Sequence, residues 1–209
     1  MMKTMIVASA IAFGLFACSN ANENAEDTAE KSKVETVETN PVSYNIDTET
    51  SVISWKGSMI GVYAHEGTLS VSSGSVTLKD GAVTEGNFTV DMNSMVTTDD
   101  DALYEMAPRE KLIGHLQSPD FFATEEFPTG DFKVMSVSGD VITGELTLKG
   151  VTKEATINSV KVDETDGSFS ATGNLVFNRQ DFGISYENTM NDMVLSDDIE
   201  LAISILGNN

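Results

Sequence analysis

Short runs in which apolar and polar residues alternate recur from Pro41 to the end of the chain. The clearest runs carry an apolar side chain at every second position: Phe88, Val90 and Met92; Leu146 and Leu148; and Ile199, Leu201, Ile203 and Ile205. A period of two is typical of a β-strand that turns one face to an apolar interior and the other to water. The pattern therefore predicts a domain built from strands.

Turn-forming residues separate these runs at close intervals. They fall at Ser73-Gly74, Asp80-Gly81, Glu85-Gly86, Ser138-Gly139-Asp140, Lys149-Gly150 and Asp166-Gly167. Connections this short favour antiparallel hairpins. About eight to ten strands fit into residues 41–209, which is enough for a sandwich or a closed barrel.

One segment, residues 99–122, departs from the strand pattern. Its apolar residues follow a ragged helical spacing, at Leu103, Met106, Ala107, Leu112 and Leu116. Pro108 interrupts the run, and proline inside a helix removes a hydrogen bond and breaks or kinks it. We expect two short helices or one kinked helix, followed by a turn that leads to Phe121 and Phe122 and closes one end of a barrel.

The N-terminus has the features of an export signal. Lys3 precedes a short apolar run, residues 5–17, which is too short to span a bilayer and matches the apolar region of a secretory signal. The run ends at Cys18, the only cysteine, in a Leu-Phe-Ala-Cys-Ser string that resembles a bacterial lipobox. We expect a lipoprotein signal peptide at residues 1–17 and acylation of Cys18, with a plain secretory signal as the alternative.

Residues 18–40 are polar and mostly acidic, with little to bury. Such a composition predicts a disordered tether, serving as a solubilising spacer or as a surface-export signal. The folded domain then occupies residues 41–209. From these features we expect the protein in the bacterial cell envelope, lipid-anchored and facing the periplasm or the outer-membrane surface.

The net charge of −21, from 12 basic and 33 acidic residues, excludes some partners. A field of this sign repels nucleic-acid phosphates and anionic lipid headgroups, so we expect no nucleic-acid binding and no membrane contact by electrostatics. A single cysteine forms no disulfide within the chain. Two histidines, His65 and His115, are too few for a standard zinc site without carboxylates.

The sequence offers no constellation for catalysis. No serine lies in a Gly-x-Ser-x-Gly elbow, and acylation would consume Cys18. The carboxylate clusters at 99–101 and 197–198 lack the spacing and turn glycine of a calcium loop, so we interpret them as solvated loop charges. We therefore expect a protein that is not an enzyme and that has neither a resident metal nor a cofactor.

Several local strings resemble one family in order and spacing. They run over nearly the whole domain: Ser54-Trp55-Lys56-Gly57, His65-Glu66-Gly67, Val90-Asp91-Met92-Asn93-Ser94, residues 114–122, Phe127-Pro128, Phe132, residues 144–153 and Asn178-Arg179-Gln180-Asp181-Phe182-Gly183. In these strings the chain is similar to the YceI-like family of bacterial periplasmic proteins. The resemblance implies an antiparallel, lipocalin-like β-barrel of about eight strands whose long apolar cavity binds a polyisoprenoid, an isoprenoid quinone or a similar lipid.

The expected lipid-contacting residues are apolar and mostly aromatic: Phe88, Val90, Met92, Phe121, Phe122, Phe132, Leu146 and Phe182, with Phe177 a weaker candidate. Each has an alternative as plain core, since side chains also fill barrel interiors. Of the adjacent pair, we expect one of Phe121 and Phe122 to plug the barrel mouth and the other to seal the helix.

For the histidines, Arg179 and Trp55 we expect more specific roles. His65 is the candidate contact for a lipid headgroup or quinone carbonyl, with packing under a turn as the alternative. We expect His115 to cap a helix end, Arg179 to pair with Asp181, and Trp55 to pack at an end of the barrel.

Two functions from different classes remain open on the sequence. The first is a binding protein that carries, stores or shields a long isoprenoid lipid and reaches the membrane through its acyl anchor. The second is a structural or protein-interaction lipoprotein with a filled barrel. The sequence also leaves open whether the domain is a monomer or a homodimer.

Overall fold

A computed structural model describes residues 40–105, 107–187 and 194–209. The expected signal peptide, Cys18 and all of the acidic tether except Asn40 lie outside the described residues, as does Met106 of the helical segment. Residues 40–209 form a unit of their own, because the nine strands and the apolar core of the described residues fall between positions 42 and 208.

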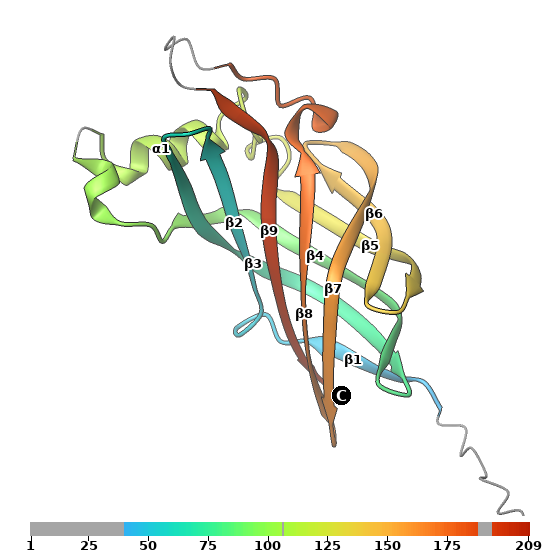
Figure 1. Cartoon of the computed structure of the whole chain (residues 1–209). Helices are drawn as coiled ribbons and strands as arrows, with labels where there is room; N and C mark the ends of the chain where they lie inside the picture. The colour runs from blue at the N-terminus through green and yellow to red at the C-terminus, as the bar shows by residue number, and fades with distance from the viewer. Residues whose placement is uncertain (1–39, 106, 188–193) are drawn as a thin grey trace, which may run out of the picture. The chain divides into compact units, whose positions relative to one another are not determined.

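The domain consists of long antiparallel strands with one helical insertion (Figure 1). The strands are β1 (Val42–Ile46), β2 (Val52–Met59), β3 (Tyr63–Lys79), β4 (Ala82–Thr97), β5 (Thr129–Ser138), β6 (Val141–Leu148), β7 (Val151–Thr165), β8 (Ser168–Asn178) and β9 (Leu195–Asn208). The helices are η1 (Asp101–Tyr104), α1 (Arg109–Gln117) and η2 (Arg179–Phe182), of which only α1 is an α-helix and the others are 3₁₀ turns.

Strands β2 to β9 form a closed ring, because β3 pairs with β2 on one side and with β4 on the other. Neighbours around the ring follow chain order from β4 to β9, and β9 then pairs with β2. The short β1 stands outside this ring and pairs with the far ends of β3 and β9. The prediction of an antiparallel, lipocalin-like barrel of about eight strands is thus confirmed.

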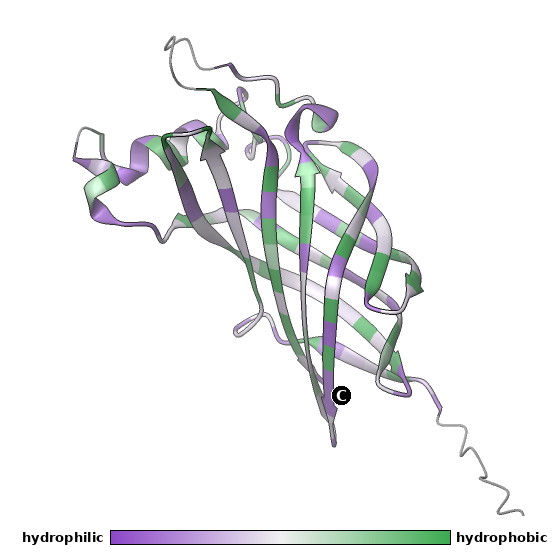
Figure 2. Cartoon of the chain, in the orientation of Figure 1, coloured by the Kyte–Doolittle hydropathy of each residue, from purple (hydrophilic) through white to green (hydrophobic). Residues whose placement is uncertain are grey.

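Alternation of side chains separates the interior from the surface, and Figure 2 shows apolar and polar bands alternating along the strands. In β6, for example, Ile142, Leu146 and Leu148 are buried while Glu145 between them is exposed. Successive side chains of a strand point to opposite faces, so a period of two places one set inside the ring.

The interior is packed solid at the end where β1 lies. Tyr44 and Ile46 of β1 are buried there with Leu78, Phe169 and Ile205, and the rings of Tyr44 and Phe169 are 5.1 Å apart. Both ends of the barrel domain lie here, because Asn45 of β1 pairs with Asn208 of β9 (Figure 1). We call this the packed end.

The helical insertion lies at the opposite end, as Figure 1 shows. It contains two short helices, as the sequence predicts, because Pro108 stands at the N-cap of α1 with an extended backbone. No helix in the described part of the chain is long and apolar enough to cross a membrane.

Two aromatic rings lie flat on the inner face of the sheet because the residue beneath each is glycine. Gly144 of β6 lies under Phe132 of β5, and Gly67 of β3 lies under Trp55 of β2. A Cβ at Gly144 would overlap the Phe132 ring and the carbonyl oxygen of Lys133. Such close approach is a common reason for glycine inside a strand.

We predict that Gly144→Ala lowers the free energy of unfolding by about 2 kcal/mol or more, because the methyl group would force Phe132 and the Lys133 backbone apart. Gly114→Ala is the control, since nothing lies within 4 Å of a Cβ at this exposed position of α1. That substitution should raise stability by about 0.5–1 kcal/mol through helix propensity. Denaturant unfolding measures both; equal effects in the two variants would contradict this account.

Candidate functional site

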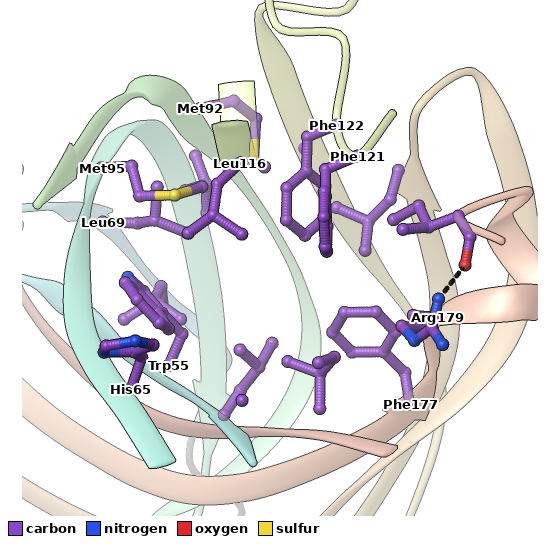
Figure 3. A pocket seen from close by; sticks show the side chains of 18 of the residues that line it. Trp55, His65, Leu69, Met92, Met95, Leu116, Phe121, Phe122, Phe177 and Arg179 are labelled. Atoms are coloured by element: carbon purple, nitrogen blue, oxygen red, sulfur yellow. Dashed lines mark hydrogen bonds between the residues drawn. The ribbon is translucent and has the colours of Figure 1, made fainter. Parts of the chain in front are cut away.

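The barrel is hollow at the end where α1 lies. A cavity with a volume of about 230 Å³ extends between α1, the segment after it and the inner faces of every barrel strand except β7 (Figure 3). Almost all of its surface is apolar, from aromatic rings, methionine thioethers and branched aliphatic chains. The interior of the barrel is therefore filled by side chains at the packed end and hollow at the end where α1 lies.

Exposure of the lining residues indicates where the cavity opens. Its deepest walls, at Ile53, Phe132 and Leu175, are 2%, 1% and 1% exposed. Tyr63 and Leu195, which line its other end, are only half-buried. The cavity thus opens at the end of the barrel opposite the packed end.

Seven of the eight expected lipid-contacting residues line this cavity: Phe88, Val90, Met92, Phe121, Phe122, Phe132 and Leu146. The rings of Phe88 and Phe132 are stacked with centroids 5.5 Å apart, on neighbouring positions of β4 and β5. Phe182, the last residue of η2, does not line it. Its ring is buried against Phe177, edge-on with centroids 5.4 Å apart.

Phe121 and Phe122 both reach the cavity, so the expected division of roles between them is wrong. Their segment is irregular, and the backbone N–H of Phe122 donates to the carbonyl of Leu116 while Ala123 has a positive φ of 48°. This geometry turns both rings inward, with centroids 6.5 Å apart. Phe121 also packs against His115 of α1, with ring centroids 5.0 Å apart, and so seals the helix as well.

Phe177, the weaker candidate, also lines the cavity. Other lining residues were not among the expected contacts, and one of them is Trp55, which lines the cavity wall rather than packing an end of the barrel. Further apolar walls come from Met59, Leu69, Met95, Leu116, Leu175, Ile184, Ile199, Leu201 and Ile203. Alternation indicated that Ile199, Leu201 and Ile203 share a face, but not that this face borders an unfilled space.

The side chain of His115 packs against other aromatic rings and does not cap the end of α1. Its ring is edge-on to Phe121 and to Tyr186, at 5.0 and 4.7 Å, and lines the cavity beside α1. The backbone carbonyl of His115, not the side chain, accepts the hydrogen bond that ends the helix, from Ser118. The capping role expected of this side chain is therefore corrected.

Arg179 is buried at the cavity wall, but its partner is not Asp181. Its guanidinium donates to Asp197 at 2.8 Å and to the backbone carbonyls of Ile184 and Ser196. Asp181 is exposed on η2. The ion pair therefore joins η2 to β9 across the sequence, and Asp197 is a structural partner rather than a solvated loop charge.

A polar cluster stands at one edge of the cavity, around the buried carboxylate of Asp99. This carboxylate accepts four hydrogen bonds: from His65 Nδ1 at 2.8 Å, from the Glu66 backbone N–H at 3.1 Å, from the Tyr104 hydroxyl at 2.7 Å and from Arg109 at 3.0 Å. Arg109 also stacks on the Tyr104 ring at 4.2 Å. The cluster fastens the helical insertion to the start of β3.

The environment of Asp99 corrects the expectation of solvated charge for this residue. Burial acts to raise the pKa of its carboxyl group, but the hydrogen bonds from Tyr104, His65 and Glu66 outweigh burial and leave the pKa below its usual value. Burial and the bond to Asp99 together raise the pKa of Tyr104. Asp100 and Asp101 are exposed, as expected, although Asp101 pairs with Arg109.

No group of three or more histidine, cysteine or acidic side chains is placed to hold a metal ion within residues 40–105, 107–187 and 194–209. The lining of the cavity offers an apolar container with a few polar groups at its edge.

We predict that Asp99→Asn destabilises the domain by about 2 kcal/mol at neutral pH, because an amide cannot accept all four bonds and leaves donors unpaired. Asp100→Asn is the control. Asp100 accepts from the Ala102 N–H as an N-cap, and asparagine caps equally well, so stability should change by less than about 0.5 kcal/mol.

The contribution of Asp99 to the free energy of unfolding should depend on pH. Because the carboxyl pKa is lower in the folded chain than in the unfolded chain, its contribution is complete above the unfolded value of about 4 and is lost as the pH falls through the folded value. The difference in unfolding free energy between wild type and Asp99→Asn should therefore shrink only in acid. A difference that shrinks between pH 7 and 5 would contradict the assignment.

The fold is shared with solved structures of low sequence identity. BcnA of Burkholderia cenocepacia is 18% identical, with a TM-score of 0.60 over 77% of this chain and 98% of that one. A structure described as a polyisoprenoid binding domain from Saccharophagus degradans, implicated in plant cell wall breakdown, is 14% identical, with a TM-score of 0.54 over 79% and 97% of the two chains.

Curated relatives match over a shorter stretch. The UPF0312 proteins SA2479 and SAS2572 of Staphylococcus aureus are 39% and 40% identical over 83 residues, which is 36% of this chain. The match spans about half the length of these relatives, 48% in both cases. The model of the YceI-like domain matches residues 44–206, which include all of β2 to β8 and most of β9. The chain therefore belongs to the YceI-like domain family.

Proposed function

We propose that this protein binds a long apolar lipid of the polyisoprenoid or isoprenoid-quinone type in the hollow half of its barrel. The observation that carries the proposal is the cavity itself, an apolar space that seven barrel strands, α1 and the Phe121–Phe122 segment line together. Its lining extends from half-buried residues at the opening to the buried wall at Phe132 and Leu175, which gives an apolar chain contacts along the barrel.

Burial of apolar surface supplies enough affinity for such a ligand. Each methylene group removed from water contributes about 0.8 kcal/mol, so one five-carbon prenyl unit contributes roughly 3–4 kcal/mol before entropic costs. A few buried units suffice for micromolar binding or better. No charged partner is required, which is consistent with a chain of net charge −21.

The likeness to the Saccharophagus degradans domain, whose description names polyisoprenoid binding, supports the same ligand class. The alternative of a structural lipoprotein with a filled barrel fits only the packed end, where Tyr44, Leu78 and Phe169 occupy the interior. The hollow end favours the binding function over it.

His65 is the residue we propose for the polar end of the lipid. Its Nδ1 lies 2.8 Å from Asp99 and 3.2 Å from the oxygen of Tyr104, whose own hydroxyl proton points to Asp99. Because both neighbours are acceptors, the proton of the neutral ring lies on Nδ1 and Nε2 is left as an acceptor. His65 lines the cavity and therefore suits a hydroxyl group, as in a prenol or quinol, better than a quinone carbonyl.

Acylation of Cys18 would hold the domain at a membrane of the bacterial cell envelope, where it could carry, store or protect the lipid. The placement of Cys18 at the end of the apolar run, as the chain's only cysteine, supports this part of the proposal. Two or more acyl chains on one residue give stable anchoring.

We predict that Leu175→Trp, which projects an indole into the cavity, lowers the amount of lipid that copurifies by about tenfold or more, since several buried methylene groups lose their place. Native mass spectrometry and organic extraction of the purified protein measure the loss. The mass of the extracted lipid also identifies its polar end, for which we expect a hydroxyl group.

Val176→Trp is the matched control for this experiment. Val176 is the next residue of β8, points outward and is 55% exposed, so the indole would lie in water and lipid loading should stay at the wild-type level. A folded Leu175→Trp variant that retains its lipid, or wild-type protein that carries only bulk phospholipid, would refute the proposed function.

We predict that Cys18→Ala moves the protein from the membrane fraction to the soluble fraction of the cell envelope, because the acylated residue is lost. Folding should be unaffected, since Cys18 lies outside residues 40–209. Lipid loading in cells should fall as the cavity is held less often near a bilayer. Incorporation of an acyl-chain label into wild type but not into the variant checks the anchor; a variant that still incorporates label would contradict it.

A further inference from the structure

Three aliphatic side chains stand in water at the open end of the barrel. Ile60 and Val62, in the turn between β2 and β3, are 60% and 56% exposed, and Val194, just before β9, is 62% exposed. The backbone joins them, because the Ile60 N–H donates to the Val194 carbonyl at 2.8 Å. We call these three residues the apolar rim.

The apolar rim is continuous with the cavity wall. Met59 and Tyr63 flank the turn and Leu195 follows Val194, and all three line the cavity. An apolar ligand that enters or leaves at this end therefore passes directly over the rim. Isolated exposed aliphatic residues are ordinary, but a group that continues an apolar cavity to the surface is typical of an interaction site.

The charge of the turn that carries Ile60 and Val62 favours a neutral partner. No charged residue occurs from Gly57 to Ala64, although the whole chain carries 33 acidic and 12 basic residues. Tyr63, which follows the turn at the start of β3, has an aromatic body and a polar hydroxyl, a combination that is enriched at membrane–water interfaces.

The backbone of the turn is suited to an apolar surrounding. The N–H of Ile60 is bonded to Val194, and the N–H of Val62 donates to the Met59 carbonyl at 3.0 Å. In hydrocarbon an unpaired backbone group costs several kcal/mol, so a turn with these donors already paired can enter a bilayer interface more easily.

We propose that the apolar rim docks on the surface of a neutral phospholipid bilayer and inserts Ile60, Val62 and Val194 among the lipids. This goes beyond lipid binding in the cavity, because it assigns the surface at which the cavity meets a membrane. The exposed carboxylates of Asp100 and Asp101 lie on the insertion that Asp99 fastens to His65, near this end, and repel anionic headgroups. Docking is therefore stronger on zwitterionic than on anionic lipid.

The length of chain before β1 permits docking on the membrane that would hold Cys18. β1 begins at the packed end, so the tether has to pass the length of the barrel for the rim to face that membrane. The 17 residues of β3 span at most about 56 Å, and residues 19–40 span about 70 Å when extended. The reach of the tether is sufficient.

The test uses residues 40–209, which contain the whole described core, and flotation with phosphatidylcholine vesicles. We expect wild type to float with the vesicles. The double variant with Ile60→Ser and Val62→Ser should bind them at least about tenfold more weakly, because its apolar side chains no longer enter the lipid. Vesicles containing phosphatidylglycerol should bind wild type more weakly than pure phosphatidylcholine vesicles do.

Met135→Ser is the matched control, since Met135 is as exposed as Ile60, at 60%, but lies in β5 away from the opening. It should leave vesicle binding unchanged. Equal losses in both variants, or no binding by wild type, would overturn the proposal. So would a concentration-dependent dimer that the double variant abolishes, since the rim would then contact a second copy.

A second measurement does not depend on the double variant. Residues 40–209 contain no cysteine, so Ile60→Cys and Met135→Cys each provide a unique site for an environment-sensitive fluorophore. On adding phosphatidylcholine vesicles, the emission should shift to the blue at position 60 and stay constant at position 135. The same response at both positions would overturn the proposal, whether or not the cavity is found to hold a lipid.

Discussion

Closure of the ring between β3 and β4 is the constraint on which the rest of the structure depends. Once eight antiparallel strands pair in a closed circle, their backbone hydrogen bonds fix the width of the interior, whatever side chains point into it. The chain fills that width at one end with Tyr44, Leu78 and Phe169 and leaves it unfilled at the other. Glycines beneath Trp55 and Phe132 let both rings lie close against the sheet, where they line the unfilled space.

The insertion after β4 is held by electrostatics as well as by apolar packing, in which Ile113 and Leu116 of α1 contact the core. η1 and α1 contain no fully buried residue, and Asp99 connects their start to His65 through a saturated carboxylate. The same histidine lines the cavity, so the geometry of the insertion and the orientation of this ring are linked. A change that moves Tyr104 of η1 therefore also alters the hydrogen bonding of His65.

Strands, turns and the proline-divided helices were predictable, because they follow from local periodicity and turn chemistry. The division of the barrel interior into a packed end and a cavity was not predictable from the sequence. Ile203 and Ile205 occupy equivalent positions of one alternating run, yet Ile203 borders the cavity and Ile205 packs in the core, a difference set by their neighbours across the sheet. Arg179 likewise pairs with Asp197 rather than with the nearer Asp181, because the pairing depends on where η2 meets β9. Such outcomes depend on distant parts of the chain and leave no local signal.

The position of β1 determines how this domain can be presented to other molecules. Both ends of the barrel domain leave at the packed end, where Asn45 and Asn208 are paired (Figure 1). A fusion partner, an affinity tag or a solid support joined to either end therefore stands away from the opening. Immobilised in this way, the domain would present its cavity to the surrounding solution, in an orientation suited to screening apolar compounds by surface-based detection.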